Sequence, residues 1–121
     1  MPTIQDILTK RDEAVRSISA RILAAGALKN AGAEGMEPVI RNLEDQRDAI
    51  LAQALASILS SAELTTAIDI IKNATDRMNA TAAQMVDAAT FLAKIAGFLG
   101  DGKKVVDALQ KLAPKPKNPN P

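Results

Sequence analysis

One kind of side chain recurs at a strict interval over a long stretch of this chain. The apolar series Leu64, Ile71, Met78, Met85, Leu92, Leu99 has a spacing of seven residues throughout. Seven residues are close to two helical turns, so the series would lie along one face of a helix. It predicts a helix over about 62–99, which at 1.5 Å per residue would be about 57 Å long. The alternative is a break or kink near 73–80, where weak helix formers gather.

Two short motifs predict where helices start. In TIQD at 3–6 and SSAE at 60–63, a hydroxyl residue stands three positions before a carboxylate. That is the pattern of a capping box, in which the two side chains satisfy each other's backbone N–H groups. The motifs predict one helix that begins near Thr3 and another that begins directly after Ser60.

Between these starts the sequence predicts one loop and one further helix. Gly26, Gly32 and Gly35 place the loop within 27–36. Apolar residues at helical spacing predict the second helix over 38–59. Because this helix would end where the SSAE motif starts, we expect the second and third helices to be antiparallel neighbours or sharply bent.

The C-terminal part divides into a short helix and a tail. The tripeptide GDG at 100–102 predicts the end of the long helix, and apolar spacing predicts a fourth helix over 103–112. Residues 114–121 are rich in proline and lack an apolar pattern. We expect a disordered tail there, after a single helical domain over 1–113.

Composition agrees with a helical core. Apolar residues make up 47% of the chain and aromatic residues only 2%, so the apolar content is mostly aliphatic and rich in alanine. Alanine is the best helix former and a poor strand residue. The predicted fold is all-α: an antiparallel four-helix bundle with one long helix and a flexible, proline-rich C-terminal tail. Alternatively, a partner or a second copy covers the part of the long helix that the other helices leave exposed.

The residue inventory argues against catalysis. The chain has no histidine and no cysteine, which removes the commonest general base, the commonest metal ligand and thiolate chemistry. The carboxylates of Glu44, Asp45 and Asp48 lack the histidines that a di-metal site in a helical bundle needs. We therefore expect no enzyme, no catalytic, cofactor-binding or metal-binding residues, no cofactor and no small-molecule substrate.

The remaining prediction is a non-catalytic interaction or structural protein, such as a bacterial accessory or secreted factor. Phe91 and Phe98 belong to a second apolar stripe with Val86 and Ile95. The predicted partner surface, for another protein or for a second copy, lies around Phe91, Phe98 and Val105. We expect no specific nucleic acid partner. Residues 1–102 carry thirteen acidic and ten basic side chains, and the chain has no aromatic platform for bases.

A lipid-surface or membrane-active amphipathic protein is the alternative. Residues 85–112 combine an apolar arc, both phenylalanines and lysines, as interfacial helices do. The five lysines and one aspartate of 103–121 predict weak binding to a membrane surface. The N-terminus has no apolar signal region and no uncharged run reaches about 20 residues. We therefore expect a soluble protein, cytoplasmic or secreted without a classical signal peptide.

Overall fold

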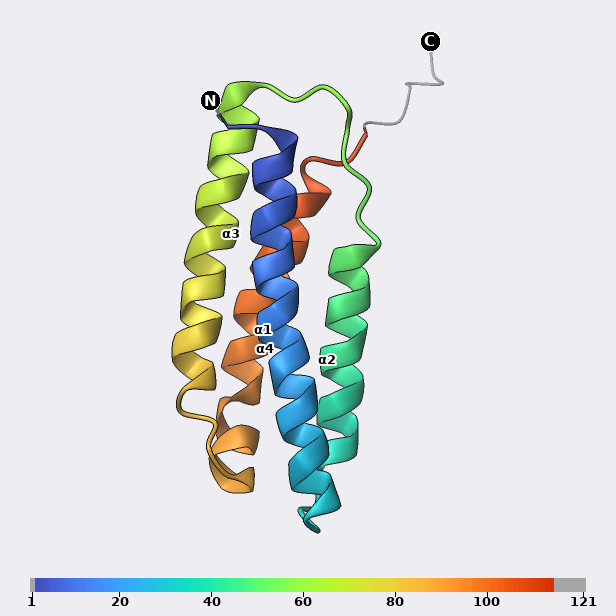
Figure 1. Cartoon of the computed structure of the whole chain (residues 1–121), viewed down its shortest axis with the longest axis vertical. Helices are drawn as coiled ribbons and strands as arrows, with labels where there is room; N and C mark the ends of the chain where they lie inside the picture. The colour runs from blue at the N-terminus through green and yellow to red at the C-terminus, as the bar shows by residue number, and fades with distance from the viewer. Residues whose placement is uncertain (1, 115–121) are drawn as a thin grey trace.

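A computed structural model describes residues 2–114 and shows an all-helical fold. The helices are α1 (Ile4–Asn30), α2 (Met36–Leu51), α3 (Ser61–Ala82) and α4 (Ala88–Gln110). In Figure 1, α1 and α3 run downward while α2 and α4 run upward, so successive helices are antiparallel. The predicted antiparallel four-helix bundle is confirmed. Of the predicted disordered tail, residues 115–121 lie outside the described residues.

The bundle consists of two helical hairpins packed side by side. α1 pairs with α2 and α3 pairs with α4, while α1 also packs along α3 and α2 along α4. These last two contacts join parallel helices (Figure 1). Within residues 2–114, α2 and α3 do not pack on each other. The prediction that they are antiparallel neighbours was therefore wrong.

The cause of this error is the segment that connects α2 to α3. α2 ends at Leu51, and residues 52–60 cross over the upper end of the bundle (Figure 1) although they include good helix formers. The backbone N–H of Ala56 donates to the carbonyl of Leu112 at 2.8 Å. Leu55 and Leu59 pack half-buried against the core. These contacts hold the segment in a non-helical conformation, so tertiary packing overrides local propensity.

The two predicted capping boxes are confirmed. The N–H of Asp6 donates to Thr3 Oγ1 at 3.2 Å, and the N–H of Glu63 donates to Ser60 Oγ at 3.1 Å. In both boxes the carboxylate accepts in return from the backbone N–H of the capping residue. The first loop also falls within its predicted range, at residues 31–35.

The single long helix over 62–99 was wrong, and so was the alternative break near 73–80. The helix stops at Ala82, and a new one starts at Ala88. Asp87 starts it with a third capping box, in which the N–H of Thr90 donates to Asp87 Oδ1 at 2.8 Å. The glycines at 100–102 do not end this helix, so the predicted separate helix over 103–112 is the C-terminal part of α4.

The break changes which side chains reach the core. Leu64, Ile71, Met78 and Met85 are buried, but Leu92 is 44% exposed and Leu99 is half-buried. In α4 and just after it, a different series with the same spacing is buried, namely Phe91, Phe98, Val105, Leu112. Buried residues therefore recur every seven positions in both helices, but the series of α4 does not continue the series of α3.

A polar contact holds α2 against α4. Gln46 Nε2 donates to the carbonyl of Leu99 at 2.7 Å, and a Cβ on Gly102 would overlap the Gln46 carboxamide. The glycine therefore leaves the space that the carboxamide fills. This contact explains why a glycine lies inside α4, where it costs about 1 kcal/mol relative to alanine.

We predict opposite behaviour for two adjacent residues of α4. Phe91→Ala removes a fully buried ring and should lower the free energy of unfolding by about 3–5 kcal/mol. Leu92→Asp changes a side chain that is 44% exposed and should cost less than about 1 kcal/mol. Urea denaturation followed by circular dichroism measures both. A larger loss in Leu92→Asp than in Phe91→Ala would contradict the observed phase of α4.

We also predict that the effect of an alanine at position 102 depends on Gln46. Gly102→Ala should lower the free energy of unfolding by about 1–2 kcal/mol, because the new Cβ displaces a hydrogen-bonded carboxamide. In a Gln46→Ala background the same change should become stabilising, because only the gain in helix propensity remains. Gly26→Ala, in α1 with nothing within 4 Å of its Cβ, is the control and should stabilise by about 0.5–1 kcal/mol. Equal effects of Gly102→Ala in both backgrounds would contradict this coupling.

Candidate functional site

The predicted partner surface lies inside the bundle. Phe91, Phe98 and Val105 are each 0% exposed and belong to the core. Arg21 of α1 places its guanidinium over the Phe91 ring, 6.0 Å from the ring centroid. A partner could reach these three side chains only if the bundle opened, so the surface available to a partner must be sought elsewhere.

The opposite side of α4 differs in composition from the exposed sides of the other helices. Its exposed residues over three turns are uncharged and mostly small, and they recur at helical spacing. We call these residues the α4 outer face: Ala89, Leu92, Ala93, Ala96, Gly97, Gly100. Lys94 is the only charged residue between Asp87 and Asp101, and helical periodicity places it off this face.

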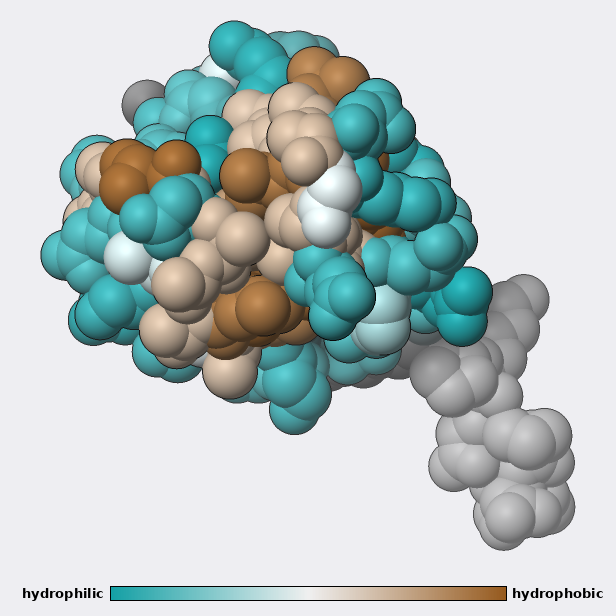
Figure 2. All heavy atoms as spheres, turned by 90° about the horizontal axis from the view of Figure 1, so that it is seen from below, coloured by the Kyte–Doolittle hydropathy of each residue, from teal (hydrophilic) through white to brown (hydrophobic). Residues whose placement is uncertain are grey.

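Other helices have charged outer surfaces, which makes the α4 outer face distinctive. Exposed charged residues of α1, α2 and α3 include Asp12, Arg16, Arg41, Asp45, Asp69, Lys72, Asp76 and Arg77. Figure 2 views the bundle from its lower end, where α4 begins, and shows apolar residues gathered in the middle with hydrophilic residues around them. Val86, in the loop before α4, adds a side chain that is 76% exposed.

Two glycines on the α4 outer face have no packing role within residues 2–114. A Cβ built at Gly97 or Gly100 would meet nothing within 4 Å, and neither residue has a positive φ. Each glycine costs about 1 kcal/mol relative to alanine inside a helix. Unlike Gly102, these glycines leave open space that no residue of the described chain fills.

A second candidate site is an apolar pocket near the upper end of the bundle. It has a volume of about 280 Å³ between the first turns of α3 and the end of α4. From α3 it is lined by Ala62, Glu63, Thr66, Ala67 and Ile70. The C-terminal part contributes Ala108, Lys111 and Leu112. We call it the upper pocket.

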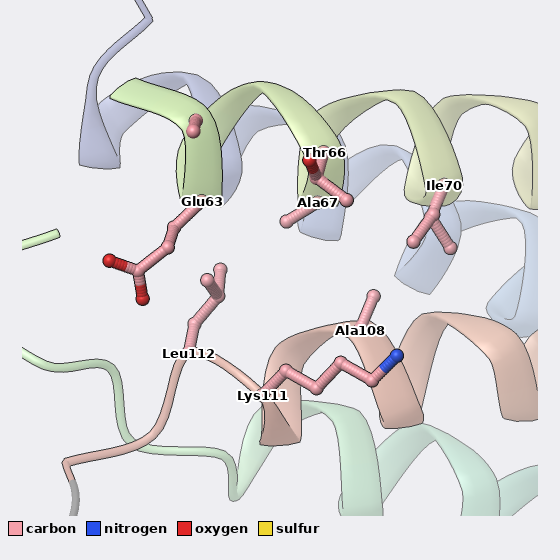
Figure 3. A pocket seen from close by; sticks show the side chains of 8 residues that line it. Glu63, Thr66, Ala67, Ile70, Ala108, Lys111 and Leu112 are labelled. Atoms are coloured by element: carbon pink, nitrogen blue, oxygen red, sulfur yellow. The ribbon is translucent and has the colours of Figure 1, made fainter. Parts of the chain in front are cut away.

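Most lining side chains of the upper pocket are aliphatic, and two charges lie at its rim. Figure 3 shows Ala67 and Ile70 pointing from α3 toward Leu112 and Ala108, with the Lys111 side chain stretched along α4. Glu63 accepts the N–H of Ser60 at 3.1 Å and is thus part of the helix cap.

A second hollow of about 270 Å³ adjoins the upper pocket and shares Glu63 and Lys111 with it. Its other side is formed by the crossing segment 52–60, where Ile58 is 89% exposed.

A third hollow, of about 520 Å³, lies between α1 and α3 and is polar. Ser17 Oγ donates to Asn79 Oδ1 at 2.7 Å across it, and Thr75 Oγ1 donates to the Ile71 carbonyl at 2.8 Å. The buried hydroxyls of Ser17 and Thr75 are thus paired with the Asn79 side chain and with the backbone. They serve to pack α1 on α3.

The surroundings of the other chemically notable groups do not form a reaction centre. Within residues 2–114, no cluster of three acidic residues could hold a metal ion. Lys94 is exposed. Over the same range, no helix combines the length and apolar character needed to cross a membrane.

Two surface carboxylates are held in their charged form. Hydrogen bonds from the backbone and side chain of Thr90 hold the pKa of Asp87 below its ordinary value. The pKa of Glu37 is lowered mainly by its hydrogen bond to Lys29, whose Nζ lies 3.0 Å from Glu37 Oε2. The first contact starts α4 and the second ties the end of α1 to the start of α2.

Comparisons of this chain with protein-family models, with curated proteins and with solved structures find no match.

We predict that acid weakens the bundle partly through Asp87. Because its pKa is lower folded than unfolded, its contribution is complete above the unfolded value of about 4 and is lost as pH falls through the folded value. Asp87→Asn keeps a good capping residue without the charge. The variant should melt like the parent at pH 7 and lose less of its melting temperature at pH 2.5. Thermal melts followed by circular dichroism measure this, and an equal acid loss in both proteins would contradict it.

Proposed function

We propose that this chain is a non-catalytic interaction protein that docks through the α4 outer face, and that the first partner of this face is a second copy of the chain. The observation that carries the proposal is the uncharged exposed surface along three turns of α4. Charged residues are normally the most exposed ones. An outer face without them is therefore the best candidate for a protein contact.

The α4 outer face complements itself in size when two copies pair antiparallel about a two-fold axis. Centring the axis between Lys94 and Ile95 places Leu92 opposite Gly97 of the second copy. The same axis places Ala89 opposite Gly100 and pairs the other alanines. Each larger residue then meets a smaller one, as close helix packing requires.

The charges at the two ends of this face are complementary as well. Asp87 lies before its first residue, and Asp101, Lys103 and Lys104 lie after its last. Helical periodicity places the two lysines, but not Asp101, on the side of this face. The same axis brings Lys103 of one copy within one helical turn of Asp87 of the other. Asp87 is an aspartate and therefore charged at neutral pH.

The size of the face limits the strength of such a dimer. From Ala89 to Gly100 the face is about 17 Å long. One helix face of this length is a small contact surface, whereas stable interfaces bury about 800 Å² on each partner. We therefore propose a weak dimer that forms with increasing concentration. Another protein that binds the α4 outer face more tightly would displace the second copy.

The lipid-surface alternative has lost its main support. It was based on an apolar arc, both phenylalanines and the lysines that follow, and both phenylalanines are fully buried. Val86 and Leu92 remain as exposed apolar side chains. Both positive and negative charges surround them, namely Asp87, Lys94 and the charged residues after Gly100. We therefore favour a protein partner.

Light scattering after size-exclusion chromatography tests the proposal over a range of concentrations. We expect the mass to rise above the 12.7 kDa of one chain as concentration increases. Ala96→Glu places a charge in the centre of the face and should keep the protein monomeric without changing its far-UV spectrum. Thr65→Glu, at an exposed site of α3, is the matched control and should still dimerise. A parent protein that stays monomeric at the highest concentration would contradict the self-docking, and vesicle binding that Ala96→Glu abolishes would favour a lipid surface instead.

A further inference from the structure

We infer that the upper pocket binds the hydrocarbon chain of a medium-chain carboxylate and that Lys111 holds its carboxylate. The pocket lies at the opposite end of the bundle from the start of the α4 outer face, so this inference does not depend on the proposed docking. It rests on the shape of the pocket, on its lining and on the charges at its rim.

The dimensions of the pocket fit a slender apolar molecule. Its volume is about 280 Å³, just below the range of about 300–1,000 Å³ that is typical of ligand sites. Along α3 it extends from Ala62 to Ile70, a distance of about 12 Å at 1.5 Å per residue. This length accommodates a short alkyl chain.

The lining favours hydrocarbon over a polar solute. Ala67, Ala108 and Leu112 are buried or nearly so, yet their side chains border the hollow. Figure 3 shows these side chains directed into the space between α3 and α4. A ligand that covers this apolar surface gains free energy in proportion to the area removed from water.

The charges at the rim select the polar end of the ligand. Glu63 is engaged by the N-terminus of α3, where it completes the cap with Ser60. Lys111 is exposed, and none of the ion pairs found in the described part of the chain includes it. A cation beside an apolar pocket complements an anionic head group, and a carboxylate is the simplest head group that a lysine ammonium can bind.

The position of Lys111 at the end of α4 also places its side chain beside the pocket lining. Ala108 and Lys111 are three residues apart on one helical turn, so the lysine stem lies beside the apolar lining. Lysine stems cover apolar surface while the ammonium stays in water. A bound carboxylate could thus meet the ammonium at the rim without being buried.

A titration of the full chain with octanoate, octan-1-ol and octylammonium tests this inference. Two-dimensional NMR of backbone amides and alanine methyl groups would follow each probe below the concentration at which it forms micelles. We expect saturable shifts at Thr66, Ala67 and Ala108 with octanoate. Because an exposed ion pair contributes only modestly, octanoate should bind about threefold more tightly than octan-1-ol. Octylammonium should bind more weakly than both.

Three variants make the test specific. Lys111→Gln should abolish the preference for octanoate over octan-1-ol, while Lys94→Gln, which removes another exposed lysine of the same helix, should preserve it. Thr66→Trp changes an exposed rim residue and should block all three probes without unfolding the bundle. The inference is overturned by shifts that spread over the surface without saturation, by undiminished binding to Thr66→Trp, or by a preference that survives Lys111→Gln.

Discussion

The packing of the bundle depends on the residue at which α4 starts, because this start decides which of its side chains face the core. α3 presents Leu64, Ile71 and Met78 to the core, and the loop that follows buries Met85. If the helix had continued, Leu92 would be next, and the aromatic rings one residue before it in each repeat would point away from the core. Asp87 prevents this, because its capping box starts a new helix in which Phe91 and Phe98 face inward. Since these rings are the largest buried side chains, this choice of phase decides the packing of all four helices.

The parts of the fold that local chemistry determines could be predicted from the sequence, and the parts that depend on distant contacts could not. Thr3 and Ser60 were recognisable as caps because a capping box is complete within four residues. The Asp87 box is equally local, but an uninterrupted seven-residue spacing through Met85 concealed it. The end of α2 depends on Ala56 binding the carbonyl of Leu112, which is far away in the sequence. For the same reason, no local signal showed that Gly102 accommodates Gln46 rather than ending a helix.

The same distinction between local sequence and distant contacts applies to the candidate sites. An apolar stripe was visible in residues 91–105, but the sequence alone does not show whether such a stripe faces the core or a partner, because both need the same side chains. The structure assigns Phe91, Phe98 and Val105 to the core. The α4 outer face was hidden because alanine and glycine give a weak hydropathy signal. The upper pocket requires α3 and α4 to be adjacent, with Lys111 at its rim, so no short motif could have predicted it.

The glycines of α4 separate the needs of the fold from the needs of a partner. Gly102 is explained within the chain, because the Gln46 carboxamide fills the space where a Cβ would be. Gly97 and Gly100 are not explained in this way, since the described part of the chain places nothing within 4 Å of a Cβ at either position and their backbone conformation suits any residue. Alanine at either position would strengthen the helix by about 1 kcal/mol at no steric cost. A partner helix that approaches α4 closely would give both glycines a role, because the absence of a side chain allows the two backbones to come together.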